Sequence, residues 1–257
     1  MQHPRTDRPN RPFVGQLSEG NTMNYRMLLA AAVLPLAAIP TAAFAQDEAA
    51  AAGPIDISAQ VGAFSDYRFR GISLSGKDPE VTASVTVSHE SGLYASLWAS
   101  NVDLGNGGAK NVEMDWTAGF TKDVGPVTVD VGAVYYTYAN NSGFNYVEAY
   151  GSLGTKVGPA DVKVGVAYAP SQSNIGSQDN LYYYVSGDVP FGETGWSAHG
   201  TFGIEDGAFG DHKKDWKVGM SYDLGSGFTA SLDYVDTAHA LTPLGDATVV
   251  GGLTFDF

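Results

Sequence analysis

The segment ATVVGGLTFDF, residues 247–257, decides the fold of this chain. Its odd-numbered positions are all apolar or glycine and form one face: Ala247, Val249, Gly251, Leu253, Phe255 and Phe257. The even-numbered positions form a second face, which includes Thr248, Thr254 and Asp256. A period of two residues is typical of a β-strand, because successive side chains of a strand point to opposite faces. The segment therefore predicts a strand with one apolar face.

The same alternation recurs in about twelve segments between residues 55 and 257, each near the ~9–11 residues that a tilted strand needs to cross a bilayer. In one of them, Val or Ala at 81, 83, 85 and 87 alternates with Thr or Ser at 82, 84, 86 and 88. A soluble β-sandwich has the same pattern with its apolar face turned inward. Two further observations favour an all-β fold of another kind: a closed antiparallel transmembrane β-barrel of about twelve strands, connected as an up-and-down meander.

The first observation is that short and long connections alternate strictly. The short connections contain glycine: HESG, KDVGP, KVGP, PFGETG and DLGSG. The others are longer and polar, such as SLSGKDP, NVDLGNGGAKN, PSQSNIGSQDN and DGAFGDHKKD. This alternation places the short turns and both termini at one end. Outer-membrane barrels have the same asymmetry, with short periplasmic turns and longer external loops.

The second observation is the position of the aromatic side chains. One set lies next to the short turns: Phe120, Phe191, Trp196, Tyr222, Phe228 and Phe257. Another set lies towards the longer connections: Tyr67, Phe69, Tyr168, Tyr183, Trp216 and Tyr234. Small aliphatic residues occupy the middle of the segments. Two aromatic girdles around an aliphatic band indicate a bilayer, because Trp and Tyr rings prefer the headgroup level.

The N-terminal region indicates export. Arg26 precedes an apolar stretch, 27–45, that ends in AFA, the small-x-small pattern of a signal-peptide cleavage site. A transmembrane helix is the alternative, but the stretch is short and contains Pro35 and Pro40. We therefore expect an upstream extension at 1–22, a signal peptide at 23–45, a short linker at 46–54 and an outer-membrane barrel at 55–257.

Charge and composition exclude several classes of partner. Without residues 1–45 the chain has 10 basic and 26 acidic residues, a net charge of −16, which makes nucleic acid a poor partner. The absence of cysteine excludes disulfides and thiolate metal sites. No glycine pattern of a phosphate or dinucleotide loop occurs, so no cofactor is predicted. The expected surroundings are the lipids of the outer membrane.

The C-terminal strand also resembles the signal that bacterial outer-membrane barrels present to the machinery that inserts them. An apolar, aromatic C-terminus is unfavourable in water and favourable at the edge of a bilayer. We therefore interpret Phe255 and Phe257 as an assembly signal, with the barrel-assembly machinery as its partner.

Four motifs carry a family resemblance: SDYRFRGIS at 65–73, ESGLYASLWASNVD at 90–103, YYTY at 135–138 and NYVEAYG at 145–151. They resemble those of the TorF-type porin family, and the resemblance covers essentially the whole chain after residue 45. It implies an outer-membrane barrel classed as a porin chiefly by its fold. It supplies no catalytic residue and no substrate, because a fold alone does not establish transport.

Arg68 and Arg70 are the only arginines after residue 45, and both lie in the first motif. Counting alternate positions from Ile55 predicts that both point into the lumen near the external mouth, with Tyr67 and Phe69 facing lipid. The arginines could form a cationic constriction that selects anions. Alternatively, they could hold the first loop to the barrel through carboxylates. The candidate partners are Asp66, Glu113, Asp115 and Glu148. We favour the structural interpretation.

The same count gives a mainly acidic lumen. The inward acidic residues are Glu113, Asp115, Asp130, Glu148, Asp161, Glu205, Asp215 and Asp233, against Lys156, Lys163 and Lys217. Such a lumen favours cations. Inward aromatic residues narrow it further: Tyr94, Trp98, Tyr136, Tyr150, Tyr182 and Tyr184. We therefore expect a small or plugged pore.

These features predict passive passage of small solutes or ions. A second hypothesis is a structural or interaction barrel with an occluded lumen. A third is an outer-membrane lipid hydrolase, which needs His and Ser together on the lipid face. The candidate is His199 with Ser197 or Ser186, but His199 faces the lumen in this count. No enzyme activity and no metal site are predicted, and the stretch HKK at 212–214 is expected to be a solvated loop.

Overall fold

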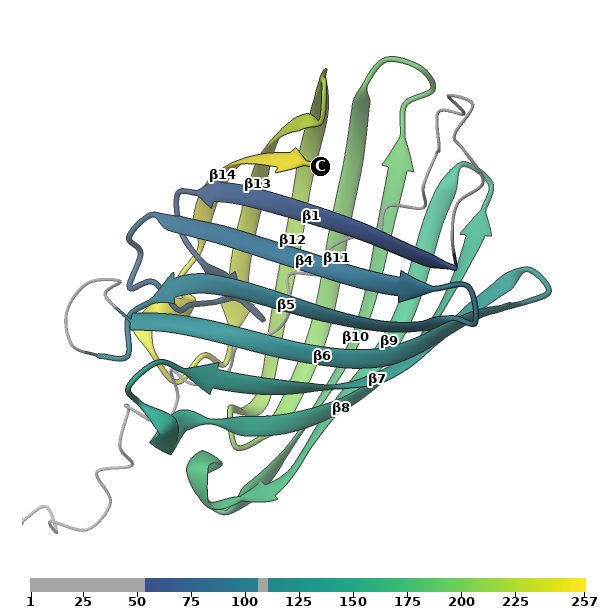
Figure 1. Cartoon of the computed structure of the whole chain (residues 1–257). Helices are drawn as coiled ribbons and strands as arrows, with labels where there is room; N and C mark the ends of the chain where they lie inside the picture. Colours follow the sequence, from purple (N-terminus) through teal and green to yellow (C-terminus); the bar gives the residue numbers. More distant parts are fainter. Residues whose placement is uncertain (1–53, 106–110) are drawn as a thin grey trace, which may run out of the picture.

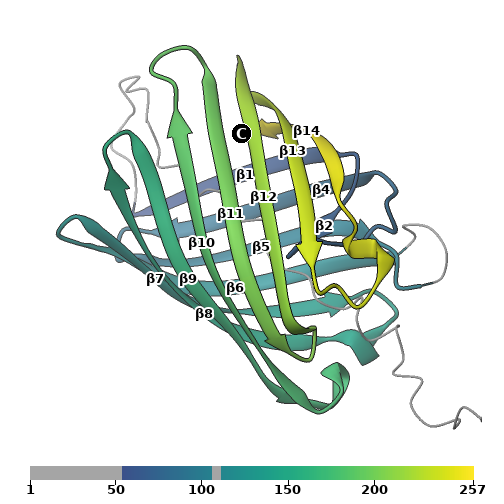
Figure 2. The ribbon, with the colours of Figure 1, turned by 180° about the vertical axis from the view of Figure 1, so that it is seen from behind.

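A computed structural model describes residues 54–105 and 111–257 of the chain. The expected upstream extension, the signal peptide and the linker as far as residue 53 lie outside the described residues. Twelve strands pair in the order β1-β14-β13-β12-β11-β10-β9-β8-β7-β6-β5-β4 and close into a barrel (Figures 1 and 2). Every neighbouring pair is antiparallel. The predicted twelve-stranded meander is confirmed.

The barrel strands are β1 (Ile55–Phe64), β4 (Glu80–His89), β5 (Leu93–Val102), β6 (Asn111–Val124), β7 (Val127–Tyr138), β8 (Tyr146–Val157), β9 (Ala160–Gln172), β10 (Gln178–Pro190), β11 (Trp196–Gly207), β12 (Gly210–Gly225), β13 (Phe228–Ala238) and β14 (Thr248–Asp256). The connection 65–79 between β1 and β4 contains two short strands, β2 (Arg68–Phe69) and β3 (Ile72–Ser73), which form a small hairpin. The whole connection 65–79 is called the hairpin below. The described residues also form three 3₁₀ turns: η1 (Ser142–Phe144), η2 (Ser173–Ile175) and η3 (Pro243–Gly245). None of the helices in the described ranges is long and apolar enough to span a membrane.

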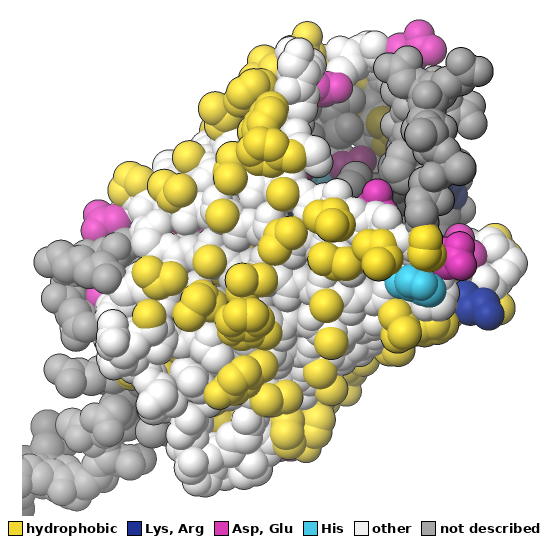
Figure 3. Space-filling model, viewed as in Figure 1, with side chains coloured by type: hydrophobic (Ala, Val, Ile, Leu, Met, Phe, Trp, Pro, Cys, Tyr) yellow, Lys and Arg dark blue, Asp and Glu magenta, His cyan; other side chains and the backbone are white. Residues whose placement is uncertain are grey.

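The barrel has its apolar side chains outside and its polar side chains inside. On β4, Val81, Val85 and Val87 are exposed, whereas Glu80 and Thr82 are buried. The face of the barrel seen in Figure 3 carries many hydrophobic side chains and few charged ones. A soluble sandwich would bury these valines, so the alternation has the orientation of a barrel in lipid.

One connection differs from the prediction. The sequence DGAFGDHKKD was expected to be a long loop, but β11 continues to Gly207 and β12 begins at Gly210. Lys213 is opposite Glu205 in the register, and its Nζ is 2.8 Å from Glu205 Oε2. The inward polar face therefore continues along both strands, and this buried pair stabilises the extended hairpin.

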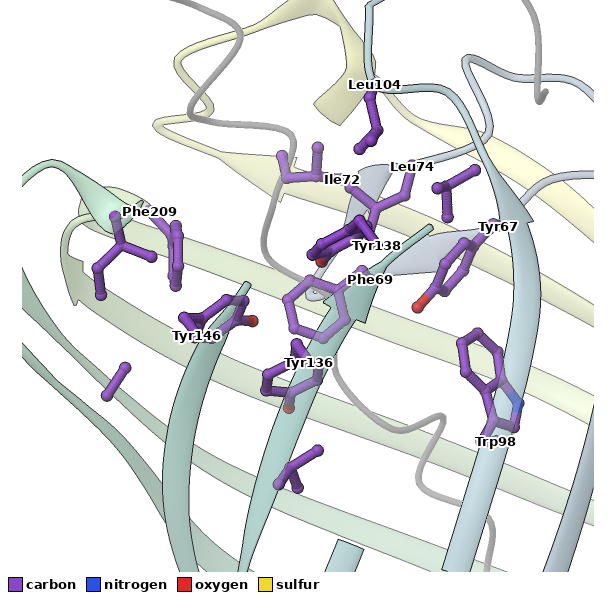
Figure 4. Close-up of a cluster of buried hydrophobic side chains, with 14 residues drawn as sticks. Tyr67, Phe69, Ile72, Leu74, Trp98, Leu104, Tyr136, Tyr138, Tyr146 and Phe209 are labelled. Atoms are coloured by element: carbon purple, nitrogen blue, oxygen red, sulfur yellow. The ribbon is translucent and has the colours of Figure 1, made fainter. Parts of the chain in front are cut away.

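The hydrophobic core lies inside the lumen, at the end of the barrel with the longer connections, here called the long-loop end. Figure 4 shows this core around Phe69, which comes from the inserted hairpin, with Tyr136 and Tyr146 from the wall. The prediction that Tyr67 and Phe69 face lipid is wrong, because their exposed fractions are only 3% and 2%. Counting alternate positions predicts inward and outward side chains only along a strand of the wall. The chain leaves the wall after Phe64, so the count does not apply to Tyr67 and Phe69.

Candidate functional site: a hairpin held across the lumen

The hairpin begins where the chain turns away from the barrel wall. The backbone amide of Ser65 donates to the carbonyl of Gly251 on β14, and the chain then enters the lumen. In the hairpin, Phe69 pairs with Ile72, which leaves Arg70 and Gly71 as a two-residue turn. Both turn residues have positive φ, 42° and 82°. A two-residue hairpin turn of type I′ requires positive φ at both positions, and glycine adopts it without strain.

The tip of the hairpin touches β13 and β12, which are two and three strands away from β1 in the barrel order. A Cβ built on Gly71 would overlap the Oγ1 atom of Thr237 on β13 and lie 2.9 Å from the Cβ of Asp215 on β12. On its other side the hairpin contacts β5, where the Tyr67 and Trp98 rings are 5.4 Å apart. The hairpin therefore packs inside the lumen between β5 on one side and β12 and β13 on the other.

Arg68 stabilises the base of the hairpin. Its Nε donates to Asp66 Oδ2 at 2.6 Å, and its Nη1 donates to the carbonyls of Leu244 and Asp246 at 3.0 Å each. The other oxygen of Asp66 accepts hydrogen bonds from the hydroxyls of Ser73 and Ser75, at 2.6 and 3.0 Å. These contacts join the hairpin to the connection between β13 and β14.

Arg70 joins the tip of the hairpin to two distant strands. Its Nη2 donates to both carboxylate oxygens of Glu148 on β8, at 2.7 and 2.9 Å. Its Nη1 donates to Glu205 on β11 at 2.5 Å. The guanidinium also lies over the ring of Tyr182, 4.2 Å from its centroid. Charge-assisted pairs of this kind fix geometry as well as contributing energy.

The Arg70 turn has a third bond to the wall, through Lys213. The Nζ of Lys213 donates to the backbone carbonyl of Arg70 at 2.5 Å and also pairs with Glu205. Burial alone would lower the pKa of the Arg70 guanidinium. Glu148 and Glu205 outweigh burial and hold this pKa well above its ordinary value. Arg70 is therefore a charged group, enclosed by two carboxylates.

The structure places the four predicted carboxylates in two separate groups. Asp66 and Glu148 contact the arginines. Glu113 and Asp115 lie on β6, where Glu113 accepts a hydrogen bond from the Tyr138 hydroxyl at 2.8 Å. Within the described ranges, neither carboxylate oxygen of Asp115 has a hydrogen-bond partner.

Two residues of the site were not predicted as arginine partners. Glu205 was placed in the lumen but not beside Arg70. Lys213 was assigned to a loop. The available signal was the alternation of Glu205, Lys213 and Asp215, which continues the inward face through the supposed loop.

The histidine considered for hydrolysis lies at the short-turn side of the lumen. His199 Nε2 is 2.5 Å from Asp233 Oδ1, and this pair joins β11 to β13. His199 therefore has a carboxylate partner inside the barrel and does not lie on the lipid face.

The two C-terminal aromatics lie at the short-turn end. The rings of Phe255 and Phe257 are 4.6 Å apart, and Phe255 also packs against Phe228 at 4.5 Å. The backbone amide of Phe257 donates to the carbonyl of Ala59 on β1 at 2.9 Å. The last residue thus belongs to the seam that closes the barrel.

Comparisons with known proteins agree with this architecture. A family model described as "Bacterial protein of unknown function (Gcw_chp)" matches residues 48–249. No curated protein sequence matches the chain. The structure is similar to that of the KdgM porin, with a TM-score of 0.54 and 10% identity over 78% of this chain and 99% of that chain. A structure described as "KdgM porin in complex with disordered oligogalacturonate" gives a TM-score of 0.52 and 11% identity, over 78% and 98%. At these identities the similarity concerns the fold alone.

Proposed function

The chain belongs to the Gcw_chp family, and from the geometry of its lumen we propose that it is a porin-like barrel of the outer membrane in which hairpin 65–79 restricts the passage of small solutes or ions. The observation that carries the proposal is the seating of Arg70 between Glu148 and Glu205, because these bonds hold the hairpin across the lumen.

The two halves of the lumen differ in how tightly they are filled. In the long-loop half, wall residues such as Glu113, Tyr146 and Asn180 are almost completely buried. In the short-turn half, inward residues such as Ser84 and Lys163 are only partly buried. This contrast supports a solvated chamber that is narrowed at one end.

Four further features support the proposal. The apolar outer face suits a bilayer, and the acidic lumen favours cations over anions. The resemblance of SDYRFRGIS to the TorF-type porins agrees with an outer-membrane barrel classed as a porin, and assignment to that type is part of the proposal. The expected signal peptide would direct the chain to the outer membrane.

Planar-bilayer recordings test the proposal. We expect small conductance steps from the wild-type barrel and larger ones when residues 66–75 are replaced by a Gly-Ser segment of equal length. The same kind of replacement at residues 191–195, in a turn at the opposite end, is the matched control and should leave the conductance unchanged. Migration on a gel before and after heating verifies that each variant is folded.

The packed long-loop half also supports the second hypothesis, an occluded barrel whose loops act as a structural or interaction surface. Silent bilayers from folded wild-type protein and from the folded 66–75 variant would favour this hypothesis and contradict transport. Equal conductance in both would show that the hairpin does not restrict passage.

A further inference from the structure

Three inward tyrosines share one construction in the lumen. Tyr94, Tyr150 and Tyr184 are each directly opposite a glycine of a neighbouring strand: Gly119, Gly132 and Gly165. A Cβ on Gly119 or Gly132 would lie 2.5 Å from the tyrosine hydroxyl. Each ring therefore lies flat along the wall, in space that any other residue would fill.

Two of these rings meet. Gly119 and Gly132 are themselves a cross-strand pair of β6 and β7, and Tyr94 from β5 and Tyr150 from β8 lean towards each other over them. Their hydroxyls are hydrogen-bonded, and the Tyr94 hydroxyl also donates to Asp130 at 2.8 Å. With Tyr184 on β10, the rings extend across the wall from β5 to β10. We call Tyr94, Tyr150 and Tyr184 the tyrosine arch.

The arch presents aromatic faces to the lumen. One face of each ring covers a glycine, and all three side chains remain partly exposed. Barrel strands are tilted by ~35–45°, so a row that runs from strand to strand also climbs along the barrel axis. In the register, the row of Tyr150 continues through Ala167 to Tyr182, the ring that lies under Arg70. The arch therefore follows a path from the short-turn half towards the hairpin.

The other side of the chamber carries ionisable side chains instead of aromatic rings. His199, Asp233 and Lys217 lie on β11 to β13, and Asp188 on β10 faces His199. On the arch side, Asp130 accompanies Lys163. The chamber thus has aromatic faces on one wall, hydrogen-bonding groups at their edges and a surplus of carboxylates.

We infer that the tyrosine arch is a binding site for a neutral oligosaccharide, a substrate class that rests on the proposed transport function. The C–H face of a sugar ring is apolar and slightly positive, so it stacks on the negative face of an aromatic ring. The sugar hydroxyls hydrogen-bond to tyrosine hydroxyls and carboxylates at the ring edges. The surplus of carboxylates repels acidic sugars and selects neutral ones.

Calorimetric titration of the purified, folded barrel tests the site directly. The probes are maltohexaose, cellohexaose and chitohexaose, with hexagalacturonate as the anionic comparison. A detergent without a sugar headgroup avoids competition. We expect at least one neutral hexasaccharide to bind and hexagalacturonate to bind more weakly.

Neighbouring residues provide the matched variants. Tyr184→Leu removes a ring of the arch, whereas Tyr183→Leu removes a tyrosine of the same strand that faces outward. We expect Tyr184→Leu to weaken binding by about tenfold, the loss of one stacked ring, and Tyr183→Leu to leave it unchanged. Tyr184→Phe keeps the ring and should retain most of the affinity.

The outcomes separate the site from the transport function. If no neutral hexasaccharide binds to the folded barrel, or if Tyr183→Leu weakens binding as much as Tyr184→Leu, the inference is wrong and the tyrosines serve only to fill the space over the glycines. Conductance without sugar binding would leave the proposed function intact and remove the site. Binding without conductance would establish the site and contradict transport.

Discussion

Arg70 concentrates the polar contacts of the hairpin in one side chain. It pairs with two carboxylates from β8 and β11, lies over Tyr182, and its carbonyl accepts a hydrogen bond from Lys213. A buried charge is costly unless it is paired, so each partner depends on the others. The network is consistent with the structural interpretation of the arginines, and a selectivity role stays a prediction.

Replacing Arg70 by Ala should destabilise the barrel strongly. Glu148 and Glu205 would lose their arginine partner in a buried position, which costs about 3–5 kcal/mol for a broken buried pair. We expect a lower temperature for the change in gel mobility on heating, and a larger decrease for the Arg68/Arg70 double alanine variant.

The matched control is Lys156→Ala, because Lys156 pairs with Asp161 at 2.8 Å on the exposed rim, where ion pairs contribute little. Its melting should equal that of the wild type. Unchanged melting in the Arg68/Arg70 double variant, together with a clear shift in reversal potential, would instead support the selectivity interpretation.

The sequence predicts side-chain direction only while the chain remains a strand of the wall. Glu113, Asp115, Asp130 and Glu148 are buried in the lumen as the alternation predicted. The same count placed Tyr67 facing lipid, but its side chain is buried inside the lumen. Tyr67 belongs to the hairpin, so the way the hairpin folds, and not the alternation along a wall strand, sets its direction. Four apolar side chains of this loop join the core inside the lumen, but no local pattern reports that direction, since the hydrogen-bond partners of the loop lie on distant strands.

At the scale of elements, period-two alternation and glycine-containing turns predict the strands well. The connection between β11 and β12 was mistaken because the five charged residues of DGAFGDHKKD resemble a solvated loop. Lys213 and Glu205 neutralise each other across the hairpin, so their charges do not oppose burial. Charge count alone is therefore a weak guide to where a barrel strand ends.

Two adjacent lysines of β12 test this explanation. Lys213→Ala should destabilise the tip of the β11–β12 hairpin and the Arg70 turn, because Glu205 and the Arg70 carbonyl lose a buried donor. Lys214→Ala changes an exposed side chain and should have little effect. We expect faster hydrogen exchange at residues 205–213 in the first variant and wild-type exchange in the second. Equal exchange in both variants would mean that the strand extension does not depend on the buried pair.

At the scale of the whole molecule, closure distinguishes this fold from an open sheet. An open sheet edge in lipid leaves backbone groups unpaired, each costing several kcal/mol. The seam between β1 and β14 pairs Gln60 with Asp256 and Phe64 with Gly252, and it is shorter than the pairing of β1 with β4, which runs from Ile55 to Phe64. The seam is therefore where the C-terminal residues have the greatest influence on closure.

Phe257 is predicted to guide assembly rather than transport. It lies at the short-turn end, away from the hairpin, and the residue is 72% exposed. Its backbone nevertheless bonds to β1 and its ring packs on Phe255.

Deleting Phe257 should lower the yield of folded barrel in the outer membrane of cells, measured by gel mobility without heating. Any conductance of the fraction that does assemble should equal that of the wild type. Phe191→Ala, which removes an exposed aromatic from a turn, is the matched control and should assemble normally. Normal yield without Phe257 would contradict the assembly signal. A changed conductance would show instead that the seam influences the lumen.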